Sequence, residues 1–207
     1  NKMGLISNGT TIFDAGAIDS GIAKGALTFI KKLTASSSGT LSFVNGTSSV
    51  VFDDTYKEYV FTFKNIHAAT DEASLLFQVD TGSNTSYNTT IQSTRFRALH
   101  GENGGNGAIG YQAGEDEQLT TNFQDIAQEL GSDNDQSAAG TLTIFNPSST
   151  TFTKHFIANF QTAISSDHTM NTFTAGYFNT TTALNKVQFK MSSGNIDAGD
   201  ICLYGIS

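Results

Sequence analysis

The most regular pattern in the sequence is Tyr56-Lys57-Glu58-Tyr59-Val60-Phe61-Thr62-Phe63-Lys64, in which large apolar residues alternate with polar ones. A period of two is typical of a β-strand that buries one face, because successive side chains point to opposite sides of a sheet. The stretch therefore predicts a strand that covers a hydrophobic core. The residues expected to face the core are Tyr59, Phe61 and Phe63, with Glu58, Thr62 and Lys64 on the other side.

Similar short stretches recur along the chain, separated by clusters of Ser, Gly, Asn, Asp and Thr that suit turns. Many short strands without helical crossovers favour antiparallel pairing, and hence an all-β fold: an antiparallel β-sandwich or jelly roll of about ten strands. The other expected strands are residues 27–33, 40–44, 75–79, 94–99, 141–145, 153–158, 172–178, 186–191 and 200–206.

One segment, residues 115–130, departs from this pattern. Its apolar residues between Phe123 and Leu130 fall at roughly helical spacing, and Gly131 follows where a helix C-cap would lie. The spacing predicts one short helical or irregular excursion there. The length of 207 residues fits a single all-β domain. We expect residues 1–26 to form an N-terminal arm and first strand that makes contacts, and residues 27–207 to form one β-sandwich domain.

Composition argues against several classes of partner. Only 14% of the residues are charged and the formal net charge is −8. No basic cluster extends beyond Lys31-Lys32, so nothing in the sequence would follow a phosphate backbone, and nucleic acid is not an expected partner. We expect no membrane insertion, because no apolar run reaches the length of a membrane span or of a signal-peptide core. Since Asn1 is not an initiator residue, the chain fits a processed or trimmed product, with Met3 as an alternative start.

Candidate chemistry is sparse. Asp133-Asn134-Asp135 offers oxygen ligands at alternate positions, as a calcium loop does, but it lacks the Gly and the distal Glu of an EF-hand. A polar turn and a calcium site at Asp133 and Asp135 both remain open. The four histidines form no recognised metal motif, and the adjacent carboxylates Asp53-Asp54 suit a solvated turn. We therefore expect no catalytic residue and no cofactor other than calcium.

The aromatic residues favour a packed core, with 16 Phe, 6 Tyr and no Trp. Phe in alternating strands is expected to be buried. Tyr87 and Tyr111 fall in polar loops and are the candidates for stacking against a glycan. The single cysteine, Cys202, lies in an apolar stretch and is expected to be a buried free thiol.

Several characteristic phrases of the sequence stand at residues 4–11, 29–38, 54–59, 145–149, 189–196 and 203–206. Taken together, they resemble virion structural proteins of tailed bacteriophages, particularly those of aquatic, cyanophage-like viruses. The similarity runs from residue 4 to the end of the chain. The group has no catalytic motif to carry over, and the Asp200-Ile201-Cys202 segment departs from its usual ending while keeping the alternation.

The resemblance implies a non-enzymatic protein present in repeated copies in the virion, assembled in the host cytoplasm. It would decorate the capsid head or form part of a tail or fibre appendage, with copies of itself and other virion proteins as partners. The alternative is a carbohydrate-binding module or host-attachment adhesin that binds a host-surface glycan. A glycan-cleaving enzyme is a third class, for which no motif is visible. The residues expected to make assembly contacts are Leu5, Ile6, Ile12 and Phe13.

Overall fold

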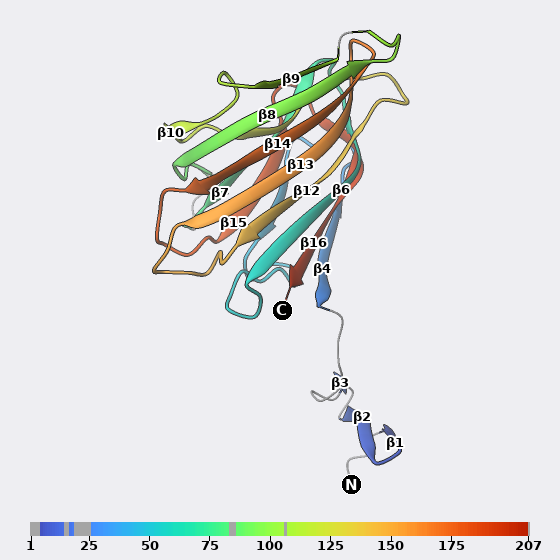
Figure 1. The fold of residues 1–207 in the computed structure, drawn as a ribbon. Helices are drawn as coiled ribbons and strands as arrows, with labels where there is room; N and C mark the ends of the chain where they lie inside the picture. Colours follow the sequence, from blue (N-terminus) through green and yellow to red (C-terminus); the bar gives the residue numbers. More distant parts are fainter. Residues whose placement is uncertain (1–4, 15–16, 19–25, 83–85, 106, 207) are drawn as a thin grey trace.

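The computed structural model describes residues 5–14, 17–18, 26–82, 86–105 and 107–206. The described part is all-β, as the sequence predicts, and its strands are antiparallel throughout (Figure 1). The strands are β1 (Leu5–Ser7), β2 (Thr10–Asp14), β3 (Ala17–Ile18), β4 (Leu27–Thr34), β5 (Leu41–Val44), β6 (Glu58–Ala68), β7 (Ala73–Asp80), β8 (Ile91–Gly101), β9 (Ala108–Tyr111), β10 (Gln118–Thr120), β11 (Gln124–Leu130), β12 (Ala138–Phe145), β13 (Lys154–Ile164), β14 (His168–Phe178), β15 (Lys186–Met191) and β16 (Ile196–Ile206).

The strands form two hydrogen-bonded sheets. The small sheet has the order β1-β2-β3, and the large sheet contains 13 strands. Within the large sheet, β4-β16-β6-β12-β13-β14-β8 form a broad layer, with β9 and β10 paired to the far edge of β8. The strands β11-β7-β15-β5 form a narrow layer, which joins the broad one where Leu130 of β11 pairs with Ile164 of β13. The large sheet therefore folds over on itself as a sandwich that curls nearly into a barrel (Figure 1).

Aromatic rings fill the space between the two layers. Phe61 and Phe63 of β6 contact Phe189 of β15, with ring centroids 5.4 and 5.1 Å apart. Phe77 of β7 lies 5.1 Å from Phe156 of β13 in the same cluster. These rings are at most 2% exposed, so they contribute both area burial and edge-to-face contacts.

The expected orientation of β6 is confirmed. Tyr59, Phe61 and Phe63 are buried, whereas Lys64 on the other face is exposed. Cys202, the single cysteine, is a buried free thiol as predicted.

In the narrow layer, β7 and β11 are buried on both faces, whereas β5 and β15 alternate between buried and half-buried residues. All residues of β7 are buried except Leu76, which is half-buried. The outer face of β7 is covered by loops, because the side-chain amide of Gln78 donates to the carbonyls of Thr89, Thr121 and Asn122 at 3.0, 3.2 and 2.7 Å. The exposed sheet face of the sandwich is therefore the outer face of the broad layer, which is turned towards the viewer in Figure 1.

Of the helical or irregular excursion predicted near residues 115–130, the helical alternative is wrong, whereas the segment is irregular at residues 112–117 and 121–123. The segment contains the strands β10 and β11, which pair with β8 and β7. The ladder of β11 shifts register between Asp125 and Ala127 and again between Ala127 and Leu130. Because such bulges break the strict alternation of a strand, and because β11 is buried on both faces, its apolar residues recur at a spacing that imitates a helix.

Candidate functional site

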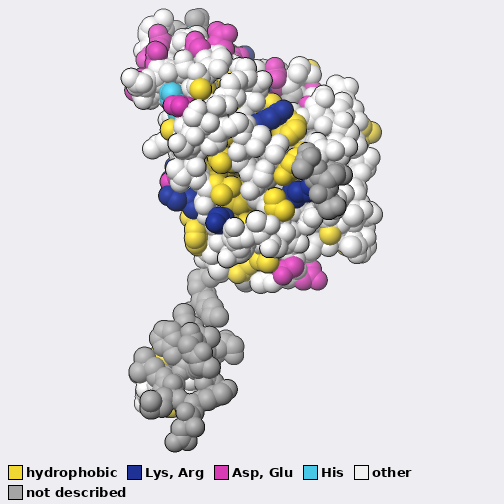
Figure 2. Space-filling model, turned by 180° about the vertical axis from the view of Figure 1, so that it is seen from behind, with side chains coloured by type: hydrophobic (Ala, Val, Ile, Leu, Met, Phe, Trp, Pro, Cys, Tyr) yellow, Lys and Arg dark blue, Asp and Glu magenta, His cyan; other side chains and the backbone are white. Residues whose placement is uncertain are grey.

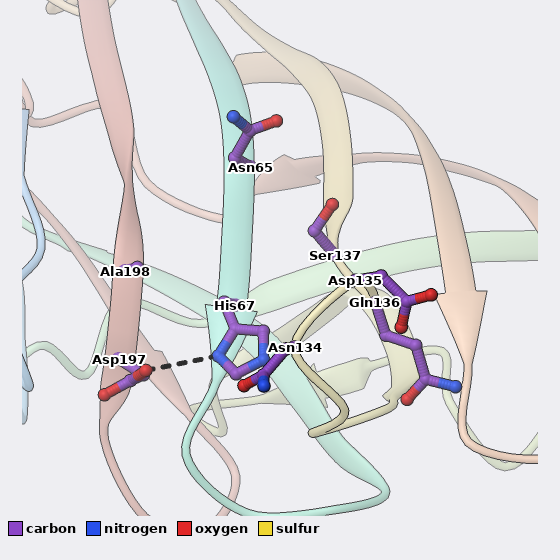
Figure 3. A pocket seen from close by; sticks show the side chains of 8 residues that line it. All are labelled: Asn65, His67, Asn134, Asp135, Gln136, Ser137, Asp197 and Ala198. Atoms are coloured by element: carbon purple, nitrogen blue, oxygen red, sulfur yellow. Dashed lines mark ion pairs between the residues drawn. The ribbon is translucent and has the colours of Figure 1, made fainter.

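A polar cleft lies where three chain segments meet at one end of the broad layer (Figure 3). Its volume is about 370 Å³. Asn65 and His67 come from β6, residues 134–137 from the turn before β12, and Asp197 and Ala198 from β16. The lining offers amide, hydroxyl, imidazole and carboxylate groups, which are donors and acceptors for a polar, uncharged ligand.

Irregular backbone in neighbouring strands opens this cleft. The ladder between β16 and β6 shifts register on both sides of Ala198, and the ladder between β12 and β6 shifts between Ala138 and Gly140. Asn65 adopts φ 50°, and Gly199 adopts φ 117°. A Cβ at Gly199 would lie 2.6 Å from the carbonyl oxygen of Asn65, so only glycine fits there. Bulges re-aim side chains, and here they accompany Asn65, His67 and Asp197 at the cleft.

His67 connects the cleft walls. Its Nδ1 lies 3.3 Å from Oδ2 of Asp197, and its Nε2 lies 3.2 Å from the main-chain carbonyl of Asp133 (Figure 3). Both ring nitrogens therefore face acceptors within the protein. A general base needs a ring nitrogen that can reach a proton of the substrate, and neither nitrogen of His67 is free for that role in this arrangement. Instead, His67 tethers the 131–137 turn to β6 and β16.

The predicted calcium ligands lie at this cleft but do not form a cation cage. Asp135 lines the cleft, whereas Asp133 contributes its main-chain carbonyl to His67. Among the described residues, no group of three or more His, Cys, Asp or Glu side chains is arranged to hold a metal ion. Calcium at Asp133 and Asp135 stays a prediction.

The outer face of the broad layer carries exposed aromatic side chains. Phe96 of β8 pairs with Phe173 of β14 across the strands, and their rings stack with centroids 4.9 Å apart and planes 12° apart. Phe96 and Phe173 are 43% and 42% exposed. Because the two stacked rings on adjacent strands project together from the sheet, we call Phe96 and Phe173 the aromatic ridge. Tyr111 of β9, which is paired with Phe96, continues the row.

Beside the ridge runs an apolar groove. Its floor is the next cross-strand row, in which Thr94, Ala175 and Ile157 pair across β8, β14 and β13. The far wall is formed by Tyr177 and His155, whose rings lie 6.0 Å apart. One hollow of about 150 Å³ lies against the ridge, and another of about 400 Å³ adjoins it. The described residues that line the two hollows include no Asp, Glu, Lys or Arg.

The opposite face of the molecule differs. Lys and Arg side chains lie among the hydrophobic ones near the middle of that face, and Asp and Glu side chains gather towards its ends (Figure 2). The hollows beside the aromatic ridge differ from that face, because the described residues of their lining include no charged side chain of these four types.

The two tyrosines proposed to stack on glycans have different positions. Tyr87 is 6% exposed, and Lys186 Nζ lies 5.2 Å from the centroid of its ring. The prediction of Tyr87 as an exposed stacking surface is therefore wrong, because the loop folds the ring inward. Tyr111 is 57% exposed, and its hydroxyl donates to Asp116.

The predicted assembly residues lie in the small sheet. Leu5 and Phe13 are paired in the β1–β2 ladder. Ile6 is 61% exposed and Ile12 is half-buried. The small sheet presents at least one large apolar side chain to solvent.

Sequence reasoning missed the ridge, since it assigned phenylalanines in alternating strands to the core. In the stretch Arg95-Phe96-Arg97 the arginines point inward and the phenylalanine points outward: Arg95 is 0% exposed. The sequence feature that could have indicated the inward arginines is the pair of acids in β11. Asp125 lies 3.3 Å from Arg95, and Glu129 lies 3.2 Å from Arg97.

No protein-family model, no curated protein and no solved structure matches the chain significantly. Among the described residues, no helix is long and apolar enough to cross a membrane.

Proposed function

We propose that this chain is a non-enzymatic structural protein of a tailed-phage virion, present in repeated copies that decorate the capsid or build a tail or fibre appendage. The resemblance of several sequence phrases to such proteins supports the proposal. Its partners are copies of itself and other virion proteins.

The observation that carries the proposal is the aromatic ridge and groove on the outer face of the broad layer. Exposed apolar patches of this kind mark interaction surfaces, because large hydrophobic side chains gain free energy when they leave water. The exposed side chains Phe96, Phe173 and Ile157 gather on one rigid sheet. A rigid sheet patch whose lining includes no Asp, Glu, Lys or Arg suits packing in a repetitive assembly, since little conformational entropy is lost on contact.

The test is to find the protein in purified particles. An antibody against the described domain, coupled to gold, is applied to particles prepared from the source virus, and bound gold is located by electron microscopy. Regular labelling of the head or of the tail supports the proposal and distinguishes the two locations. Particles that lack the protein by mass spectrometry, although the infected cell contains it, overturn the proposal.

A second candidate function is binding of a host-surface glycan, and the polar cleft favours it. The side chains of Asn65, Asn134 and Ser137 surround a hollow large enough for a sugar ring and present the amide and hydroxyl groups that pair with sugar hydroxyls. Glycan-array binding that is lost in Asn65→Ala and retained in Thr143→Ala, on a different part of the broad layer, supports this function. Adding a chelator in the same assay tests the calcium prediction.

A further inference from the structure

The outer face of the broad layer presents a projection and a depression side by side. The projection is the aromatic ridge of Phe96 and Phe173, and the depression is the apolar groove over Thr94, Ala175 and Ile157. Both are built on β8, β14 and β13, whose ladders are regular from end to end between β13 and β14 and between β14 and β8. Their relative position is therefore fixed by the sheet and does not depend on a loop.

The size and chemistry of the groove match the ridge. The hollow against the ridge has a volume of about 150 Å³, and an apolar cavity of about that size accommodates one benzene ring. Its lining is made of Phe, Ile, Ala and Thr side chains, which offer dispersion contacts to an aromatic ring. A phenylalanine ring from another molecule is thus a suitable occupant.

We propose that the occupant is Phe173 of a second copy of this chain, in a two-fold dimer in which each ridge enters the groove of the other copy. A two-fold interface uses the same patch on both subunits, so the patch must contain both a projection and a complementary depression. The outer face of the broad layer meets that requirement within a single surface. This inference rests on the proposed function and names the partner and the contact for it.

Charge favours this face over the others for contact between identical chains. With a formal net charge of −8, two copies repel each other, and the repulsion is smaller when the areas in contact carry no acidic side chains. The described residues of the two hollows carry no formal charge, with His155 neutral, whereas acidic side chains gather at the ends of the opposite face (Figure 2). Like-charge repulsion is therefore smaller when two such hollows face each other than when the acidic ends of the opposite face meet.

The experiment is sedimentation velocity of the full chain over a range of protein concentrations. Two variants remove complementary halves of the contact: Phe173→Ser shortens the ridge, and Ala175→Trp fills the groove. Each is expected to weaken dimer formation at least tenfold. The matched control is Phe152→Ser, which removes an exposed phenylalanine, 73% exposed, from a loop outside this face and leaves the dimer unchanged. Circular dichroism establishes that each variant is folded.

Mixing the two variants gives the most specific readout. A mixed dimer keeps one intact contact, between the ridge of Ala175→Trp and the groove of Phe173→Ser, so mixing is expected to restore association above that of either variant alone. Dimers that form equally well in all variants, or a strictly monomeric wild-type chain, overturn the inference. A monomer that is nevertheless found on particles leaves the proposed function standing, and a ridge-dependent dimer that is absent from particles overturns the proposed function alone.

Discussion

Arg95 and Asp125 form an ion pair inside the sandwich, with Nη2 of the guanidinium 3.3 Å from Oδ1 of the carboxylate. The side chain of Arg95 is 0% exposed and that of Asp125 is 9% exposed. Glu115 approaches Nη1 of the same guanidinium at 3.8 Å from the solvent side. This pair explains why β8 turns its arginine inward, which places the adjacent Phe96 on the outer face and so creates the aromatic ridge.

Replacing Arg95 by Met is expected to destabilise the protein by about 3 kcal/mol at pH 7, because Asp125 is left buried without its cation. The double variant Arg95→Met/Asp125→Leu is expected to recover most of that loss, since an apolar pair of similar volume avoids the desolvation of two charges. Urea denaturation at pH 7 measures both free energies of unfolding. A double variant no more stable than Arg95→Met would contradict the expectation.

The stability of the protein is expected to depend on pH through Asp125. Burial raises the pKa of Asp125 to about 6 from 3.8, and this outweighs the opposite effect of Arg95; Glu115 and Glu129 raise the pKa further. Between pH 3.8 and about 6 the folded state holds a proton that the unfolded state has released. The contribution of Asp125 to stability is therefore complete below pH 3.8 and is lost as pH rises through about 6.

Asp125→Asn isolates this effect, because the amide resembles the protonated carboxyl. The variant is expected to match the wild type near pH 4 and to be the more stable protein near pH 8, by roughly 2 to 3 kcal/mol. The wild type and the variant must be compared with each other because hydrogen bonds lower the pKa of the exposed residues Asp53, Asp54 and Asp200. These three residues make both proteins more stable as pH rises, which is opposite to the effect of Asp125. Parallel stability curves for wild type and variant would show that Asp125 does not titrate in this range.

The contrast between β6 and β8 shows how far alternation predicts this fold. In β6 the apolar residues are aromatic and the alternate ones are Glu, Thr and Lys, so the buried face is evident from the sequence. In β8 the same rule selects the wrong face, because Asp125, the buried partner of Arg95, lies 30 residues later, on β11. The existence of a strand is a local property, whereas its orientation depends on what the sheet packs against.

The cleft illustrates the same limit for function. The sequence indicated Asp133 and Asp135 because both lie in one short polar turn. His67 and Asp197 reach the cleft from β6 and β16, and no spacing rule connects them to the turn. Only the antiparallel pairing of β16 with β6, with its register shifts beside Ala198, brings the two side chains together.

Gly199→Ala is expected to destabilise the protein by about 1 to 3 kcal/mol, because the residue has φ 117° and its new Cβ would lie 2.6 Å from the carbonyl oxygen of Asn65. Gly110→Ala is the matched control: Gly110 lies in β9, where a Cβ meets no atom within 4 Å. Thermal denaturation of both variants provides the measurement. Equal melting temperatures would show that the bulge beside Asn65 adapts to a side chain.

His67→Leu is expected to release the 131–137 turn while leaving the sandwich folded. The imidazole joins Asp197 on β16 to the main-chain carbonyl of Asp133, and leucine keeps the bulk of the side chain but makes neither contact. The ends of the turn stay bound to β13, since Gly131 N donates to the carbonyl of Ala163 and Ala163 N donates to that of Ser137. At Asp133 itself, the contact to His67 is the one that the variant removes. The amide of Gln136, which donates to the carbonyl of Asp133 at 2.9 Å, is therefore expected to exchange with deuterium at least tenfold faster in the variant. Amides between Phe156 and Phe160 in β13 should keep their protection, because the ladders of that part of the strand to β12 and β14 do not involve the turn. His155→Leu, on the outer face of β13, serves as the control and should leave Gln136 unchanged. Unaltered exchange at Gln136 in His67→Leu would mean that the turn holds its conformation without the histidine, and the cleft would then owe its shape to the backbone bulges alone.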